Sequence, residues 1–195
     1  MRKILLFPGA FNPPHCGHAE AVIKVLEKNK NKFDELWIMP SGKRDDKNIT
    51  TDYKHRRVIG NLFVEYLKTR IDIPAKLITA ELDDKSGKFT HEILEEIKSQ
   101  PDIQVTQLIG LDGFLNIKYG LFDNEESFII IKRKGYELPE NFSHSGNIII
   151  FDGEVKPISS TQIRDMVKNN DGRYKFLVPE TIADYIEKNN LYHKT

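Results

Sequence analysis

The sequence is most informative near its start, where it reads Phe7-Pro8-Gly9-Ala10-Phe11-Asn12-Pro13-Pro14-His15-Cys16-Gly17-His18. The apolar run just before the glycine, residues 3–7, predicts a buried parallel strand. Residues 19–27 carry apolar side chains at helical spacing and predict an amphipathic helix. The order is therefore a strand, a loop rich in glycine and proline, and a helix that begins near two histidines.

This loop has the residue types that a phosphate site needs. The first backbone amides of a helix lack intrahelical partners and carry partial positive charge, so they attract anions. Gly9 and Gly17 would let the backbone approach a ligand closely, while Pro13-Pro14 holds the turn extended. His15 and His18 can donate hydrogen bonds to phosphate oxygens. Taken alone, the two histidines are also consistent with a simpler role, in which they cap the helix after a tight turn and bind no phosphate.

Length and composition limit the class of protein. The chain has 195 residues, 39% of them hydrophobic, and no net formal charge. We expect one α/β domain over residues 1–195, with a C-terminal helical part at about 157–195. The neutral balance argues against broad nucleic-acid binding, and the single cysteine excludes an intramolecular disulfide. With no apolar run of membrane-spanning length and no signal peptide, we expect a soluble cytoplasmic protein without a membrane partner.

Strand and helix patterns alternate along the rest of the chain. Further strands are expected at 35–39, 74–79, 104–109, 127–131 and 147–151. Helices are expected at 53–69, from residue 90, after the hydroxyl residues 159–161, and from Pro179. This alternation predicts an α/β fold built on a doubly wound parallel sheet.

Polar stretches follow several of the expected strands, where ligands bind in open α/β sheets. The run 41–51 contains lysines that could reach a substrate phosphate, although such a run is usually a solvated loop. Thr51 or Asp52 can cap the next helix, whose first turn carries His55-Arg56-Arg57. These cations would face either a bound anion or the solvent. Asp112 could accept hydrogen bonds from a ribose or could cap the following helix.

A second group of polar residues reads Ile158-Ser159-Ser160-Thr161-Gln162-Ile163-Arg164. One hydroxyl suffices to cap the helix that follows, so three in a row beside Arg164 could form a second anion pocket. The planar fork of an arginine suits two oxygens of a polyphosphate. The pattern therefore predicts either a simple helix cap or a pocket for phosphate.

Taken together, these stretches resemble the nicotinate (or nicotinamide) mononucleotide adenylyltransferases, a branch of the His-x-Gly-His nucleotidylyltransferases. The resemblance runs nearly end to end. Besides the two stretches quoted above, it rests on Gly110-x-Asp112, Lys132-Arg133-Lys134-Gly135-Tyr136 and the closing Asn189-Asn190-Leu191-Tyr192. It implies a Rossmann-like fold of the HUP type. It also implies transfer of the AMP moiety of ATP to the 5′-phosphate of nicotinate mononucleotide, giving deamido-NAD and pyrophosphate in NAD biosynthesis.

The resemblance also implies a role for individual residues. Catalysis would involve His15, His18 and Arg164. ATP would be bound by Gly9, Ala10, Phe11, His15, His18, Gly110, Asp112, Ser159, Ser160 and Arg164. The mononucleotide would be bound by Asn12, Lys47, Phe89, Thr90 and Tyr119. Tyr119 or Phe122 would replace the stacking tryptophan of the family, and Mg²⁺ would be held mainly by the ATP phosphates rather than by protein ligands.

Two other functions remain open from the residues alone. The first is a sister enzyme that transfers AMP or CMP to another phosphate, such as phosphopantetheine or glycerol phosphate. The second is a non-catalytic module that binds adenine nucleotides. The sequence does not distinguish nicotinate from nicotinamide mononucleotide, and a homo-oligomer is possible.

Overall fold

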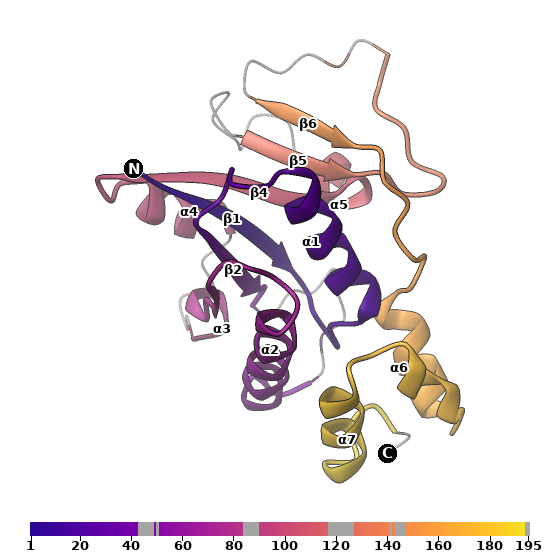
Figure 1. Cartoon of the computed structure of the whole chain (residues 1–195). Coiled ribbons are helices and arrows are strands. Elements are labelled where there is room, and N and C mark those ends of the chain that lie inside the picture. The colour runs from indigo at the N-terminus through magenta and orange to yellow at the C-terminus, as the bar shows by residue number, and fades with distance from the viewer. Residues whose placement is uncertain are drawn as a thin grey trace.

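The centre of the fold is a six-stranded sheet, all of whose strands are parallel (Figure 1). The computed structural model describes residues 1–42, 49, 51–83, 90–116, 127–140, 142 and 147–193. Across the sheet the strand order is β3-β2-β1-β4-β5-β6. The strands are β1 (Arg2–Gly9), β2 (Glu35–Pro40), β3 (Ala75–Leu77), β4 (Ile103–Gly110), β5 (Ser127–Ile131) and β6 (Ile148–Phe151). The predicted parallel α/β sheet is confirmed.

The helices are α1 (Cys16–Lys28), α2 (Tyr53–Lys68), α3 (Ala80–Asp83), α4 (Thr90–Lys98), α5 (Leu111–Asn116), α6 (Ser160–Lys168) and α7 (Glu180–Lys188), with a 3₁₀ helix, η2 (Gly172–Phe176). Three of them, α3, α5 and η2, were not expected, because segments of four to six residues are too short to show a helical period. Pro179 is the residue before α7 rather than part of its first turn. Of the two candidate caps for α2, Asp52 is the one used, since its side chain accepts a hydrogen bond from the Lys54 amide.

Helices cover both faces of the sheet, so the central strands β1 and β2 are buried on both sides. Leu5 and Phe7 of β1 pack into a cluster with apolar residues of α1, α2, α6 and α7. Their neighbours Ile4 and Leu6 point the other way and pack with residues of α4. This explains the continuous apolar runs of the central strands, and the doubly wound arrangement is confirmed.

The order of the strands reverses beside β1. From β1 the chain moves to β2 and β3 on one side, and then returns to β4 on the other side. Ligands of open α/β sheets bind at the carboxyl ends of the strands where the order reverses. Here those ends are Gly9 of β1 and Gly110 of β4. Figure 1 shows the C-terminal helices α6 and α7 beside the carboxyl end of β1 and the start of α1.

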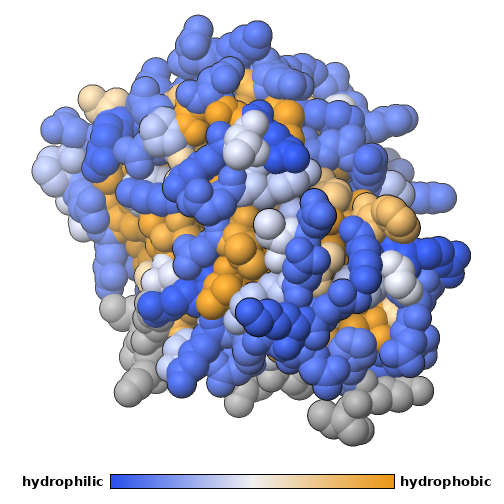
Figure 2. All heavy atoms as spheres, turned by 60° about the horizontal axis from the view of Figure 1, so that its bottom comes forward, coloured by the Kyte–Doolittle hydropathy of each residue, from blue (hydrophilic) through white to orange (hydrophobic). Residues whose placement is uncertain are grey.

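The outer surface is mixed in character. Figure 2 shows one face on which hydrophobic side chains form several separate patches among hydrophilic ones. Within the described ranges, none of the helices combines the length and the apolar character needed to cross a membrane.

Candidate active site

The two histidines at the start of α1 bind each other's backbone. His15 is the N-cap residue, and its Nδ1 accepts a hydrogen bond from the His18 amide at 3.3 Å. In return, Nδ1 of His18 accepts a hydrogen bond from the His15 amide at 3.2 Å. The two rings are stacked, with centroids 3.6 Å apart. The pair thus forms a reciprocal capping box in which imidazoles replace the usual hydroxyl and carboxylate.

The surroundings of this pair keep both rings neutral. Burial, and then the charge of Arg133, lower the pKa of His15 to about 3. The pKa of His18 is also lowered, first by burial and then by His15 and Arg133. A neutral imidazole carries one proton, and Nδ1 of each ring acts as an acceptor. The proton of each ring is therefore on Nε2, which makes the pair two neutral N–H donors.

Aromatic rings hold His18 from several sides. Its ring lies edge-on to Phe11, with centroids 5.0 Å apart, and also contacts Phe7 and Phe63. Phe11 has a φ of 43°, which turns the chain sharply after β1. A Cβ atom on Gly9 would stand 3.2 Å from the Phe11 ring, so glycine leaves room for this ring across the strand end. The apolar packing explains why His18 is desolvated.

The start of α6 is hydrogen-bonded to the loop between β1 and α1, residues 10–15, which we call the histidine loop. Arg164 donates a hydrogen bond to the Asn12 carbonyl at 2.8 Å, and the Ser160 hydroxyl donates to the Pro13 carbonyl at 2.8 Å. The two motifs, which are about 150 residues apart in the sequence, therefore form one structure. This convergence is the geometry that a shared triphosphate would require.

The three hydroxyl residues before Arg164 have different partners. Ser159 is the N-cap of α6 and accepts a hydrogen bond from the Gln162 amide at 3.1 Å. Ser160 bonds to the loop, and Thr161 accepts a hydrogen bond from Arg164 at 3.1 Å. One hydroxyl caps the helix, as expected, and the other two connect α6 to the loop and to its arginine.

Arg56 holds the same loop from the side of α2. Its guanidinium donates to the Ala10 carbonyl at 2.7 Å and to the Ser41 carbonyl at 2.6 Å, and the residue is only 3% exposed. The buried Glu81 lies close enough to interact with this charge, and it accepts a hydrogen bond from the Gly42 amide. The alternative of solvent exposure is wrong for Arg56, because this buried arginine joins the loops that follow β1 and β2.

At the end of β4, Asp112 and Arg133 lie beside each other. The carboxylate of Asp112 is 3.6 Å from Nε of Arg133. A Cβ atom on Gly110 would be 2.5 Å from the Asp112 carboxylate and 3.1 Å from Nε of Arg133, so any larger residue here would displace these two side chains. Asp112 lies within the first turn of α5 rather than before it, so its expected role as a cap is wrong.

Sequence reasoning gave Arg133 no role of its own. Yet its charge acts on both histidines, and its side chain extends past the end of β4. Its position in a basic turn directly after β5 was the available signal.

The C-terminal segment also holds the histidine loop through a side-chain hydrogen bond, which was not expected from the sequence. The Tyr192 hydroxyl donates a hydrogen bond to Oδ1 of Asn12 at 2.9 Å. Asn12 itself is buried, at 2% exposure. The only sequence signal was that Tyr192 belongs to the closing motif of the resemblance.

Several predicted site residues cannot be placed. Lys47, Phe89, Tyr119 and Phe122 lie outside the described residues. Thr90 is the first residue of α4, and the structure describes its backbone but not its side chain. In the part of the chain that the structure describes, no group of three or more histidine, cysteine or acidic side chains is arranged to hold a metal ion.

Comparison with known proteins identifies the family. A model of the cytidylyltransferase-like family matches residues 6–166. The nicotinate-nucleotide adenylyltransferase of Bacillus subtilis is 31% identical over 98% of this chain and 99% of its own length. A probable nicotinate-nucleotide adenylyltransferase of Clostridium acetobutylicum is likewise 31% identical, over 98% of this chain and 100% of its own. The chain belongs to the nicotinate-nucleotide adenylyltransferase family.

Solved structures agree with this adenylyltransferase fold. The nicotinic acid mononucleotide adenylyltransferase of Plasmodium falciparum, complexed with NaAD, matches with a TM-score of 0.77 over 98% of both chains at 23% identity. The same enzyme complexed with APC matches with a TM-score of 0.76 at 24% identity. The resemblance inferred from the motifs is thus confirmed, as is the Rossmann-like fold that it implied for this adenylyltransferase.

Proposed function

We propose that this protein joins nicotinate mononucleotide to the AMP moiety of ATP. A 5′-phosphate oxygen of the mononucleotide forms a bond to the α-phosphorus of ATP. The bond between that phosphorus and the oxygen bridging to the β-phosphorus breaks, and the electron pair leaves with pyrophosphate. The product is deamido-NAD, an intermediate of NAD biosynthesis. The names of the relatives in Bacillus subtilis and Clostridium acetobutylicum support nicotinate as the acceptor base.

One observation carries the proposal. Two stacked, neutral imidazoles lie at the strand-order reversal of the sheet, on a loop that is hydrogen-bonded to the start of α6. A helix start at this position suits a phosphate, and two N–H donors beside it suit the oxygens of a polyphosphate.

The chemistry asks more for placement than for a strong base. A phosphate already has an ionised oxygen, so the protein has to bring two anions into line and offset the charge that develops. Holding the reactants together can supply up to roughly 7–11 kcal/mol of the barrier. Nε2–H of His18 and of His15 would donate to oxygens of the reacting and departing phosphates.

Other residues would bind the ends of ATP. The amides of Gly9, Ala10 and Phe11 would face the phosphates, and Ser159, Ser160 and Arg164 would take the outer ones. Gly110 and Asp112 would contact the adenosine. To these we add Arg133, which lies next to Asp112 and acts electrostatically on both histidines. On the acceptor side we retain Asn12, Lys47, Phe89, Thr90 and Tyr119 as candidates.

Magnesium enters this proposal as part of the ATP substrate. Mg²⁺ prefers carboxylate and water oxygens, whereas the described side chains around the histidine loop are mainly imidazole and guanidinium donors. This donor set does not favour a protein cage for the metal. We therefore expect Mg²⁺ to be held by ATP oxygens and water.

The test is a turnover assay with a panel of acceptors. Purified protein is incubated with MgATP and either nicotinate or nicotinamide mononucleotide, and release of pyrophosphate is followed. We expect release with nicotinate mononucleotide, and preference for it when both mononucleotides compete at equal concentration. Release only with phosphopantetheine, or only with CTP and glycerol phosphate, would identify a sister enzyme. ATP binding without pyrophosphate release under any acceptor would identify a binding module.

A further inference from the structure

The side chain and the backbone of Asn12 are held by two different C-terminal groups. Its backbone carbonyl accepts a hydrogen bond from Arg164 of α6 at 2.8 Å, and its side-chain oxygen accepts one from the Tyr192 hydroxyl at 2.9 Å. A residue fixed at both points cannot rotate about its own bonds without losing a contact. At 2% exposure it has little water available to replace either bond.

Tyr192 reaches this position because the segment after α7 folds back onto the body of the protein. Asn190 and Tyr192 have φ values of 50° and 67°, which turn the chain sharply, and Leu191 and Tyr192 pack against the main hydrophobic cluster. The Tyr192 hydroxyl also hydrogen-bonds the side chain of Thr51, just before α2. The tyrosine thus connects the C-terminal segment to the loop after β1 and to the residues that precede α2.

The route from Asn12 to the histidines is short and stiff. Only Pro13 and Pro14 separate Asn12 from His15, and proline fixes its own backbone dihedral. The Pro13 carbonyl is bound by Ser160, so this link is anchored along its length. A change at Asn12 would therefore be transmitted to the imidazole pair rather than absorbed by a flexible loop.

We propose that Tyr192 is a positioning residue for the adenylyl transfer, whose hydroxyl fixes Asn12 and, through the two prolines, sets the position of His15 and His18. This rests on the proposed function. The hydroxyl needs no substrate contact for this role, since it acts through the loop. Burial raises the pKa of Tyr192 to about 12, so the hydroxyl remains a donor throughout the neutral and mildly alkaline range.

The chain offers a matched control. The hydroxyl of Tyr185 on α7 hydrogen-bonds Nδ1 of His55 on α2 at 3.0 Å. It likewise ties the C-terminal part to the rest of the fold, but it does not contact the histidine loop. Tyr192→Phe and Tyr185→Phe each remove one hydroxyl and leave the ring in place. A purely structural contribution of the C-terminal segment would affect the two variants alike.

The experiment compares kcat/KM for pyrophosphate release in the two variants, alone and combined with changes at Asn12. We expect Tyr192→Phe to lower kcat/KM about 3–10-fold, the effect of losing one hydrogen bond, and Tyr185→Phe to stay within about two-fold of wild type. In the Asn12→Ala background, Tyr192→Phe should cause no further loss of kcat/KM, because its partner on the histidine loop is gone and only its bond to Thr51 remains. In the Asn12→Asp background, which keeps the acceptor oxygen, the loss should persist.

A second readout needs no turnover. The ring-nitrogen NMR shifts of His15 and His18 should change in Tyr192→Phe and stay as in wild type in Tyr185→Phe. Equal kcat/KM and equal histidine shifts in the two variants would overturn the inference. The proposed function would still stand in that case, provided that the wild-type protein releases pyrophosphate. Absence of pyrophosphate release from the wild type would instead reject the proposed function, and the NMR comparison would still decide whether Tyr192 positions the histidines.

Discussion

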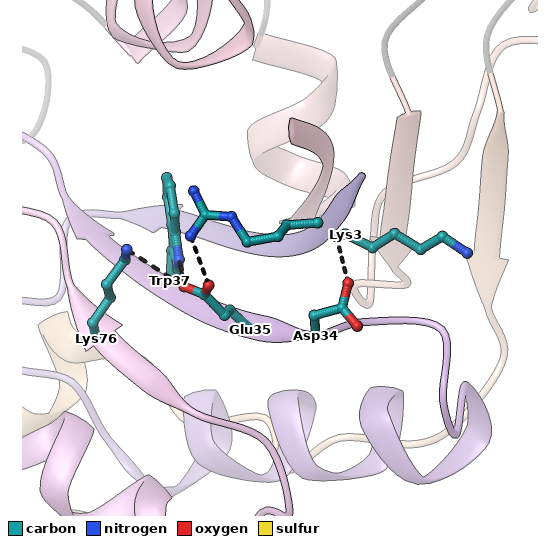
Figure 3. A network of polar contacts seen from close by, with 6 residues as sticks. Lys3, Asp34, Glu35, Trp37 and Lys76 are labelled. Atoms are coloured by element: carbon teal, nitrogen blue, oxygen red, sulfur yellow. Dashed lines mark hydrogen bonds and ion pairs between the residues drawn. The ribbon is translucent and has the colours of Figure 1, made fainter. Parts of the chain in front are cut away.

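The two ends of the parallel sheet use charged side chains in opposite ways. At the carboxyl end, Arg56 and Arg164 donate to backbone carbonyls of a single loop. At the amino end, charges pair with one another around Glu35, the first residue of β2 (Figure 3). Its carboxylate accepts hydrogen bonds from the Trp37 indole at 2.8 Å and from Arg2 at 3.1 Å. Lys76 lies 3.4 Å from the same carboxylate.

The difference concerns both geometry and solvent. The side chains of Arg2 and Lys76 are about half exposed, so water can replace most of what their ion pairs provide. The carbonyls of Ala10 and Asn12 belong to the loop that ends at the histidine pair, so their bonds determine where those rings lie. We conclude that substitutions at the carboxyl end should change catalysis, whereas those at the amino end should change stability alone.

The largest effect is expected for His18→Ala. Removing one preorganised hydrogen-bond donor to the reacting phosphates should lower kcat by about 10²–10³. The measurement is steady-state release of pyrophosphate with MgATP and nicotinate mononucleotide. His55→Ala is the control, since His55 contacts Tyr185 rather than the loop, and it should keep kcat within about two-fold. A His18→Ala enzyme with near wild-type turnover would contradict the role assigned to this imidazole.

Arg133→Ala should come next. Losing a charged donor to phosphate corresponds to a decrease in kcat/KM of about 10–100-fold. Lys134→Ala is the matched control, because Lys134 is the next residue of the same turn and is exposed. If both substitutions had the same small effect, the turn would act only through its overall charge, and Arg133 would not belong to the site.

A third prediction concerns how stability depends on pH. The folded protein holds the pKa of His15 at about 3, compared with an ordinary value of 6.5. Below pH 6.5 the unfolded chain takes up a proton that the folded protein does not, so the free energy of unfolding falls as pH decreases towards the folded value. Above pH 6.5 the ring is neutral in both states, so this loss of stability is absent.

His15→Asn keeps a good N-cap residue but removes the titrating group. Between pH 7 and pH 5 we expect the wild type to lose about 1–2 kcal/mol more unfolding free energy than this variant. Urea unfolding at the two pH values measures the difference. Parallel pH profiles would contradict this prediction, because they would mean that His15 takes up its proton at the same pH in the folded and in the unfolded protein.

The smallest effect is expected at the amino end. The Trp37 indole, and after it the Lys76 charge, hold the pKa of Glu35 below its ordinary value of 4.5. Glu35→Gln should therefore cost about 0.5–1 kcal/mol of stability above pH 4.5, and this cost should shrink as pH falls below that value. Turnover at neutral pH should be unchanged. A clear decrease in kcat would break the proposed division between the two ends of the sheet.

The architecture was predictable because it is encoded locally. Continuous apolar runs identified the strands, and a helical period identified α1, α2 and α4. The short helices α3 and α5 were missed, since a few residues do not display a period. The histidine stretch was also recognisable from its residue types, because they occur close together along the chain.

The contacts that hold the site were not predictable. Arg56 looked like an ordinary cation in a first helical turn, and only the packing of α2 against the sheet turns it towards Ala10 and Ser41. Tyr192 and Asn12 are 180 positions apart, and their contact depends on how the segment after α7 folds back. Such pairings arise from tertiary structure, which no spacing of residues along the chain reveals.

The distance in sequence between Asn12 and Tyr192 matters for the order in which the protein is made. A ribosome synthesises the histidine loop 180 residues before the tyrosine that binds it. The last strand of the sheet ends at Phe151, which also precedes that tyrosine in the chain. During synthesis the growing chain thus contains the histidine loop before it contains the tyrosine whose hydroxyl fixes that loop.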